Sequence, residues 1–376
     1  MTHVFVVNSG SSSIKYQLVD LDSGEAVLGG IVERVGEPGS GVPDHGAGLR
    51  GILAELGTEH PIDAVGHRVV HGGEQFTGPT IITDEVERGI DGLSPLAPLH
   101  NPANLQGIRA ARAALPDLPH VAVFDTAFHH TLPAAAYTYA IDRDLAAEYG
   151  VRRYGFHGTS HKYVSERTAE FLGRPLSSLK TIVLHLGNGA SATAIDGGVS
   201  VETSMGMTPL EGLVMGTRSG DIDAAVLVHL HREAGLSIDE LDTMLNRHSG
   251  LLGLTGNGDM RDVQTAASNG DEIAEAALAV YRHRIRRYIG AYIAHLGGLD
   301  AIVFTAGVGE NNSLLRRRTL AGLEFLGIRV DPDRNELSSK AARFISPEGA
   351  PVAVLVVPTN EELEIARQTA TVALGV

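Results

Sequence analysis

Apolar and polar residues alternate in short runs along the chain, and two of these runs repeat one arrangement. Residues 4–18 read VFVVNSGSSSIKYQL, and residues 181–195 read TIVLHLGNGASATAI. Each joins two apolar strands through Gly, Ser and Asn residues, which predicts a β-hairpin. Turns of small residues leave backbone N–H groups exposed, and such concavities hold phosphate oxygens. A single turn of this kind indicates only a hairpin, but its recurrence predicts two lobes that clamp a nucleotide.

The first part of the chain continues as alternating strands and helices, which predicts an α/β fold. Apolar runs predict strands at 26–32, 64–69 and 121–124, and helices from about residue 49 and over 101–115. Asn101 and Pro102 have the residue types of an N-cap and a first helical position. The segment 36–48 is rich in Gly and Pro and is predicted to be a surface loop.

The second part begins near Val151, because the second hairpin needs a sheet of its own. Apolar residues at three- and four-residue steps predict a helix over 271–296, ended by Gly297-Gly298. The next strand, 301–305, runs into AGVGEN, predicted to be a third glycine turn at the end of a strand, where α/β folds hold ligands. A strand at 351–357 and a helix at 361–373 follow, with Thr359 and Glu362 at capping-box spacing.

Composition places the chain among globular enzymes. Its 376 residues exceed the size at which one core stops growing, so two domains are expected. The net charge of −15 disfavours nucleic acid and anionic membranes as partners. The absence of cysteine excludes disulfides and thiolate chemistry, and a cytoplasmic location is the default expectation. We expect no signal peptide and no membrane-spanning segment.

Two arginines and one aspartate lie where α/β folds place reactive groups. Arg68 falls in a strand that leads to Gly72-Gly73, Arg218 lies among small residues, and Asp125 follows an apolar strand. The arginines suit an anionic substrate, but each could equally pair with a nearby carboxylate. Asp125 suits catalysis or metal orientation, although a helix N-cap is the alternative.

Other candidates carry similar alternatives. Lys15, on the outgoing strand of the first hairpin, could reach phosphate or stay solvated, and His157 could be structural. Glu361 could be associated with a metal or serve the helix that begins there. The sequence contains no GxxxxGK[ST] loop and no HExxH, and AGVGEN lacks the full GxGxxG pattern. Magnesium carried with a nucleotide fits the scattered Asn and carboxylate residues best.

These segments together resemble the acetate kinase family. The resemblance runs in order from residue 4 to about residue 367 and rests on VNSGSSSIKYQL, GHRVVHGGE, PLAPLHNP, VFDTAFHHTLP, YGFHGTSH, LHLGNGAS, SMGMTPLEGLVMGTRSGDID, FTAGVGEN and PTNEELEIA. It implies two ribonuclease H-like lobes with a nucleotide cleft, as in sugar kinases, heat-shock chaperones and actin. The lobes would be residues 1–150, joined by the C-terminal helix of about 361–376, and residues 151–360.

The resemblance also implies roles for individual residues. The catalytic set would be Arg68, Asp125, His157 and Arg218, with Mg²⁺, for which Mn²⁺ can substitute, supported by Asn8 and Glu361. Nucleotide contacts would come from Lys15, His185, Leu186, Gly187, Asn188, Gly189, Asp259, Met260, Arg261, Gly307, Val308, Gly309, Glu310 and Asn311. A small acyl pocket would be lined by Arg68, Val70, Leu99, Phe156 and Pro209.

The implied reaction is transfer of the γ-phosphoryl group of ATP to acetate, giving ADP and acetyl phosphate. A carboxylate acceptor is already ionised at neutral pH and needs no general base, so Asp125 is assigned to orientation. A propionate or butyrate kinase is the nearest alternative, because one methylene discriminates by only about 1–3 kcal/mol. A nucleotide-driven binding module of the chaperone or actin type is the alternative from another class. The resemblance also suggests a homodimer.

Overall fold

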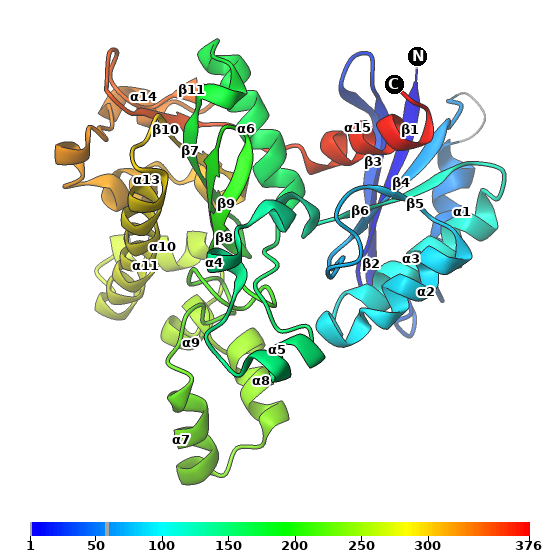
Figure 1. Ribbon diagram of the computed structural model, residues 1–376, viewed down its shortest axis with the longest axis horizontal. Coiled ribbons are helices and arrows are strands. Elements are labelled where there is room, and N and C mark those ends of the chain that lie inside the picture. The colour runs from blue at the N-terminus through cyan, green and yellow to red at the C-terminus, as the bar shows by residue number, and fades with distance from the viewer. Residues whose placement is uncertain (1, 57–59) are drawn as a thin grey trace. The chain divides into compact units, whose positions relative to one another are not determined.

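The computed structural model describes residues 2–56 and 60–376. The chain divides into two compact units (Figure 1). Unit 1 comprises residues 1–130, 158–160 and 360–376, and unit 2 comprises residues 131–157 and 161–359.

Unit 1 is built on a six-stranded mixed sheet in the order β3-β2-β1-β4-β6-β5. Its strands are β1 (His3–Ser9), β2 (Ser13–Asp20), β3 (Glu25–Glu33), β4 (Ala64–Val69), β5 (Thr80–Ile81) and β6 (His120–Phe124). The first three strands pair antiparallel, and β1, β4 and β6 pair parallel. Central strands β4 and β6 are almost wholly buried, as expected for parallel strands with both faces covered.

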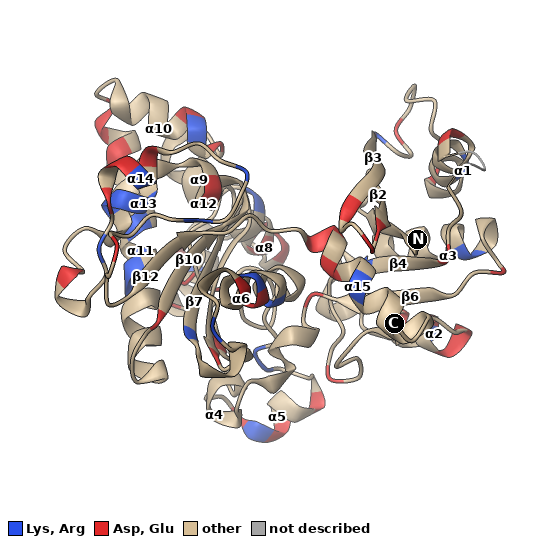
Figure 2. Cartoon of the chain, turned by 90° about the horizontal axis from the view of Figure 1, so that it is seen from above, with Lys and Arg blue, Asp and Glu red and all other residues tan. Residues whose placement is uncertain are grey.

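The α-helices among the described residues of unit 1 are α1 (His45–Leu56), α2 (Asp84–Gly92), α3 (Asn101–Ala114) and α15 (Glu361–Ala373). α15, from the end of the chain, packs on β1, β4 and β6. Gly66 of β4 permits this close approach, because a Cβ there would lie 2.5 Å from Thr369 Oγ1 and 3.0 Å from Ile365 Cγ2. The first turn of α15 is acidic, with Glu361, Glu362 and Glu364 (Figure 2).

Unit 2 repeats the same sheet, with order β9-β8-β7-β10-β12-β11. Its strands are β7 (Lys180–Leu186), β8 (Ala190–Asp196), β9 (Val199–Thr203), β10 (Ala301–Thr305), β11 (Arg343–Phe344) and β12 (Ala353–Val356). β7, β8 and β9 pair antiparallel, whereas β7, β10 and β12 pair parallel. The predicted α/β class with two ribonuclease H-like lobes is confirmed, and both predicted hairpins are present.

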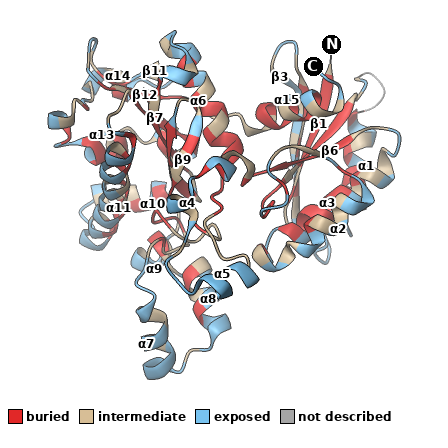
Figure 3. Ribbon diagram, viewed as in Figure 1, coloured by how far each residue is buried: buried red, intermediate tan, exposed pale blue. Residues whose placement is uncertain are grey.

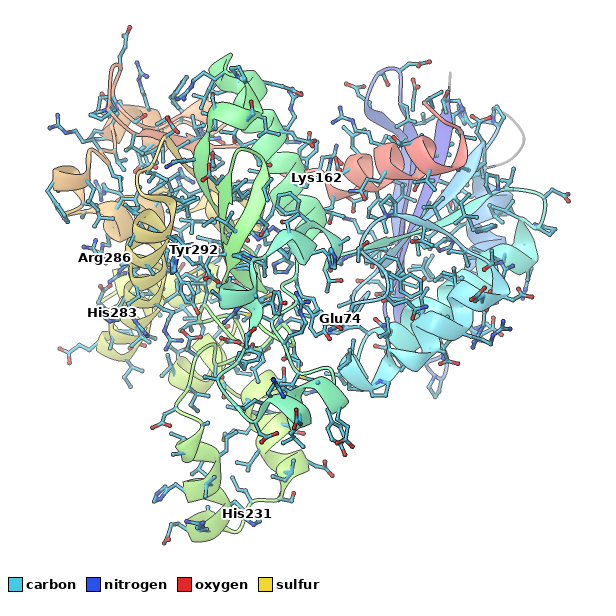
Figure 4. All side chains as sticks on the ribbon, in the orientation of Figure 1. Glu74, Lys162, His231, His283, Arg286 and Tyr292 are labelled. Carbon is cyan, nitrogen blue, oxygen red and sulfur yellow. The ribbon has the colours of Figure 1, made fainter. Side chains whose placement is uncertain are left out.

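The helices of unit 2 are α4 (Ala134–Tyr137), α5 (Arg143–Glu148), α6 (Gly158–Leu172), α7 (Ala225–Ala234), α8 (Ile238–Arg247), α9 (Gly250–Thr255), α10 (Met260–Ser268), α11 (Glu272–Leu296), α12 (Ala306–Asn311), α13 (Ser313–Leu320) and α14 (Pro332–Glu336). The first three residues of α6 belong to unit 1. The long helix α11 packs against β7 and β8. Its Tyr292 is buried, whereas Arg286 and His283 lie on its opposite side (Figure 4).

Helix α7 differs from the other long helices because none of its residues is buried (Figure 3). Val228 exposes 47% of its surface there, although the helix begins with the apolar residues AVLV. None of the described helices combines the length and the apolar character needed to cross a lipid bilayer.

Three local predictions were wrong. AGVGEN forms helix α12 directly after β10 rather than a glycine turn, with Ala306 in the left-handed region at φ 63°. His100, not Asn101, is the N-cap of α3, because the Asn101 side chain bonds to the backbone of His71. Asn360, not Thr359, caps α15, since its side chain accepts the N–H of Leu363.

Candidate active site

Arg68 and Asp125 form a bidentate ion pair in unit 1. Arg68 lies in β4, Asp125 follows the parallel neighbour β6, and the register of these strands brings the two residues together. Nε and Nη2 of Arg68 donate to the two carboxylate oxygens of Asp125 at 2.9 and 2.7 Å. Of the two interpretations of Arg68, pairing with a carboxylate therefore holds. Its side chain remains 23% exposed, against 2% for Asp125.

Burial and neighbouring charges act against each other in this pair. Burial raises the pKa of Asp125, while the charge of Arg68 lowers it. Burial would lower the pKa of Arg68, but the charges of Asp125 and then Glu361 outweigh it, so the pKa of Arg68 is raised. Arg68 is therefore permanently charged, and part of its surface is exposed to solvent. Both carboxylate oxygens of Asp125 are occupied by hydrogen bonds from Arg68.

Two asparagines of α3 anchor the backbone around this pair. Asn104 accepts the N–H of Val70 at 3.1 Å and donates to the carbonyl of Ser9 at 2.8 Å. The side-chain amide of Asn101 accepts the N–H of His71 at 3.1 Å and donates to the carbonyl of His71 at 3.0 Å. Both are buried. They fix the end of β4 and the first hairpin turn relative to one another, a role that sequence analysis missed although N-P-A-N places both amides on one helix face.

The remaining unit 1 candidates lie at the first hairpin and the start of α15. Lys15 pairs with Glu362. Glu361 accepts a hydrogen bond from Thr159 Oγ1 at 3.2 Å. The side chain of Asn8 has no hydrogen-bond partner within residues 2–56 and 60–376. An amide oxygen and a carboxylate are hard oxygen donors, so Asn8 and Glu361 fit a magnesium ion.

The described residues contain no group of three or more His, Cys, Asp or Glu that could hold a metal. Mg²⁺ commonly keeps several waters and binds through few protein ligands, so it does not require such a group.

In unit 2, Arg218 has no carboxylate partner among the described residues. Its Nη1 donates to the carbonyl of Pro209 at 2.6 Å, and burial lowers its pKa. The alternative interpretation, pairing with a nearby Asp or Glu, is thus wrong for this residue. A half-buried guanidinium without a counter-charge is an attractive position for an anion.

Arg218 and His157 converge over Gly189, in the second hairpin turn. A Cβ on Gly189 would lie 2.7 Å from Arg218 Nη2 and 3.5 Å from His157 Nε2, so the glycine leaves the space that both groups occupy. His157 sits in the left-handed region at φ 57°, and its ring stacks on His185 at 4.2 Å between centroids. A strained non-glycine residue of this kind is common at functional sites.

Beside this turn unit 2 contains a pocket of about 830 Å³. Predicted nucleotide residues that line it are Gly187, Asn188, Asp259, Met260, Arg261, Gly307, Val308 and Asn311. Its wall also includes Gly216, which leaves room for the Asn188 side chain, since a Cβ there would lie 2.1 Å from Asn188 Oδ1. At its rim Asp259 caps α10, and hydrogen bonds from Arg261 lower the pKa of Asp259 to about 2.

Sequence analysis missed Gln264 and Tyr281 in this wall. Tyr281 lies among the apolar residues whose spacing predicted the helix over 271–296, yet its buried hydroxyl has no hydrogen-bond partner among the described residues. Five predicted nucleotide residues of unit 2 are not among the residues that line the pocket: His185, Leu186, Gly189, Gly309 and Glu310. Glu310 instead accepts the backbone N–H of Thr359 at 3.2 Å.

The predicted acyl-pocket residues are divided between the units. Val70 and Leu99 belong to unit 1, and Phe156 and Pro209 to unit 2. Val70 and Phe156 are 8% and 1% exposed, whereas Leu99 is 47% exposed. Pro209 is half-buried and holds Arg218 through its carbonyl.

Comparisons with known proteins agree with this architecture. The acetate kinase of Clavibacter michiganensis subsp. michiganensis is 64% identical over the whole of both chains. The crystal structure of Porphyromonas gingivalis acetate kinase superposes with a TM-score of 0.94 at 43% identity, covering 99% of this chain and 100% of that one. A propionate kinase from Francisella tularensis gives a TM-score of 0.92 at 40% identity, with coverage of 99% and 100%. Residues 3–367 match the acetokinase family, and the chain belongs to that family.

Proposed function

We propose that this protein is an acetate kinase, which transfers the γ-phosphoryl group of ATP to acetate reversibly and with Mg²⁺. The observation that carries the proposal is the pair of groups over Gly189, where the uncompensated guanidinium of Arg218 and the ring of His157 converge beside the 830 Å³ pocket. Relatives of 64% identity that bear this name support the choice of acceptor.

In phosphoryl transfer the protein mainly positions the reactants and neutralises charge. Arg218 and His157 would donate to the oxygens of the transferring phosphoryl group. Arg68, held by Asp125 with part of its guanidinium exposed, would bind the carboxylate of the acyl substrate. Val70, Leu99, Phe156 and Pro209 would contact its methyl group.

Asp125 has a positioning role in this scheme. Both of its oxygens accept hydrogen bonds from Arg68, and the acceptor carboxylate carries no proton to remove. A phosphorylated Asp125 would require a second transfer. Direct in-line transfer predicts inversion at phosphorus, so the stereochemistry of a chiral γ-phosphoryl group separates the two routes.

The proposed metal site uses Asn8 and Glu361, whose oxygens match the preference of Mg²⁺. When bound with the nucleotide, the ion would neutralise charge on the phosphate oxygens. Lys15 would approach the same phosphates once freed from Glu362. Mn²⁺ shares these ligand preferences and should support activity.

The direct test is acetate-dependent formation of ADP, with acetyl phosphate trapped by hydroxylamine as the hydroxamate. Activity that requires acetate, ATP and a divalent cation is the expected result. ADP formation that does not depend on any carboxylic acid would instead indicate a nucleotide-driven binding module.

A propionate kinase is a second candidate, because a protein of that name shares 40% identity and the same fold. The acyl wall contains Val70 and the exposed Leu99, and one methylene changes binding by only about 1–3 kcal/mol. Values of kcat/KM for acetate, propionate and butyrate, measured side by side, decide between them. We expect acetate to be preferred.

We also propose a homodimer, formed through unit 2. The exposed apolar residues of α7 and the preceding segment, Val228 at 47% and Ile222 at 41%, offer a surface that a second copy would cover. Sedimentation equilibrium should give twice the chain mass, and V228D should lower it. A monomer at micromolar concentration would reject this part of the proposal.

The lack of cysteine agrees with a reducing, cytoplasmic setting.

A further inference from the structure

One buried serine hydroxyl connects two histidine rings beside the proposed phosphoryl site. Ser191 Oγ lies 2.9 Å from His157 Nδ1 and 2.7 Å from His161 Nε2. Ser191 is fully buried in β8, and these two ring nitrogens are the only side-chain partners that its hydroxyl has within the described residues. All three residues belong to unit 2.

The single proton of the hydroxyl restricts how the rings can be protonated. A hydroxyl donates one hydrogen bond, and a buried O–H that donated to neither ring would be left unsatisfied, so Ser191 donates to one ring nitrogen and accepts from the other. In the first arrangement His161 Nε2–H donates to Ser191, which donates to His157 Nδ1. The proton of a neutral His157 then sits on Nε2. In the second arrangement the directions are reversed, and a neutral His157 has a bare Nε2.

The surroundings of His157 favour the first arrangement. Its Nε2 reaches the space over Gly189 that Arg218 Nη2 also reaches. A bare Nε2 there would present a lone pair to an incoming anion, and a doubly protonated ring would repel the nearby guanidinium. Only the neutral Nε2–H form adds a second hydrogen-bond donor without adding charge.

We propose that Ser191, oriented by His161, is a positioning residue that fixes His157 in the tautomer with its proton on Nε2. This inference rests on the proposed function only for its kinetic consequence. Neither residue touches the reacting atoms. The relay aligns the Nε2–H of His157 with Arg218, so that both groups donate to the same oxygen-rich ligand.

The test compares Ser191→Ala with Thr193→Val in the full chain. Thr193 lies two residues along the same strand, on the same face, and its buried hydroxyl bonds at 2.9 Å to Thr203 Oγ1. Both variants therefore remove one buried hydroxyl from one surface of β8. The ¹⁵N chemical shifts of the histidine rings report the tautomer, with His157 assigned from the spectrum of His157→Gln.

We expect the wild-type protein to show His157 protonated on Nε2, and Ser191→Ala to lose that uniform state. The kcat of Ser191→Ala should fall about tenfold, with the KM for ATP changed less than about twofold, because one oriented hydrogen bond is lost. Thr193→Val should leave both the tautomer and kcat unchanged. Ser191→Cys, with its weaker donor, should fall between wild type and Ser191→Ala.

Three results would overturn the proposal: a wild-type His157 with a bare Nε2, a tautomer unaltered in Ser191→Ala, or an equal loss of kcat in Thr193→Val. If Ser191→Ala does not fold, the tautomer of the wild-type protein and of Ser191→Cys decides the matter. A failed acetate kinase assay would reject the proposed function, yet the ¹⁵N spectra would still test the relay on their own.

Discussion

Units 1 and 2 share one sheet order and one type of hairpin, but different side chains occupy the two hairpins. In each hairpin the second residue pair from the turn holds candidate side chains, Asn8 opposite Lys15 in unit 1 and His185 opposite Ser191 in unit 2. The backbone plan is the same. The first pair supplies a hard oxygen donor and a cation, whereas the second supplies an imidazole ring and a hydroxyl.

The two units also treat their arginines differently. Arg68 of unit 1 is held by the carboxylate of Asp125, as Lys15 is held by Glu362. Arg218 of unit 2 is held only by the carbonyl of Pro209. A paired cation is well oriented but partly neutralised, while an unpaired one keeps its full attraction for an incoming anion. In the proposed function, Arg68 of unit 1 would therefore orient the small ligand, and Arg218 of unit 2 would stabilise charge.

The largest effect is expected from Arg218→Ala. If this guanidinium stabilises the transferring phosphoryl group, kcat should fall by about 10³–10⁵, as for arginines of that role in related chemistry. Nucleotide affinity should change far less. Steady-state kinetics and equilibrium binding of ATP measure the two quantities, and Arg174→Ala, at the exposed pair with Asp300, is the control. Equal losses in rate and affinity would reject the role.

Breaking the paired arginine should cost stability as well as activity. Asp125→Asn leaves the cation of Arg68 largely buried without a counter-charge, so we expect a loss of about 2–4 kcal/mol in the free energy of unfolding. Urea denaturation measures it. Arg174→Gln at a solvent-exposed pair should cost less than about 1 kcal/mol. Similar losses in both variants would mean that burial does not distinguish the two pairs.

A smaller effect is expected from Gly189→Ala, which tests the space shared by Arg218 and His157. The new Cβ would lie 2.7 Å from Arg218 Nη2, the mobile end of a long side chain, so Arg218 should shift while the fold persists. Displacement by about 1 Å can reduce a rate about 100-fold, so kcat should fall roughly 10–100-fold with an unchanged unfolding midpoint. Gly10→Ala in the other turn, 3.0 Å from Ser13 Oγ, is the companion variant for stability. Wild-type kcat in Gly189→Ala would contradict this reading of the turn.

The sequence predicted what depends on local periodicity. Alternation predicted both hairpins, the strand before Asp125 and the strand that begins at Ala301. Three- and four-residue spacing predicted the whole of α11. Arg68 and Asp125 were both named because they lie in or just after apolar strands. Their pairing was only one of two interpretations, because strand order is set by contacts between residues 57 positions apart.

The remainder depends on contacts that no local pattern carries. Asn104 reaches Ser9 across 95 residues, and Ser191 reaches His161 across 30. Asn101 is of a residue type that commonly caps helices, but its side-chain amide binds the backbone of His71, 30 residues away. Tyr281 fits an apolar stripe equally well whether or not its hydroxyl borders a pocket. Each of these side chains is decided by tertiary packing.

The smallest expected effect is the response of unit 1 to acid. His67 Nε2 lies 3.0 Å from His120 Nδ1, and His120 Nε2 donates to the carbonyl of Leu115 at 3.0 Å. Burial lowers the pKa of His67 well below its usual value and also lowers that of His120. The folded protein therefore keeps both rings neutral at a pH where the unfolded chain, with histidine pKa values of about 6.5, takes up protons.

Stability should thus be unaffected by this pair above about pH 6.5 and should fall as the pH drops below it, by at most about 1.4 kcal/mol per pH unit for each ring. Amide hydrogen exchange at pH 7.5 and 5.5 should show unit 1 opening more readily in acid, and His67→Gln should flatten that dependence. His231→Gln, in the exposed helix α7, should leave it unchanged. If wild type and His67→Gln lose stability equally on acidification, groups other than this histidine pair cause the acid response of unit 1.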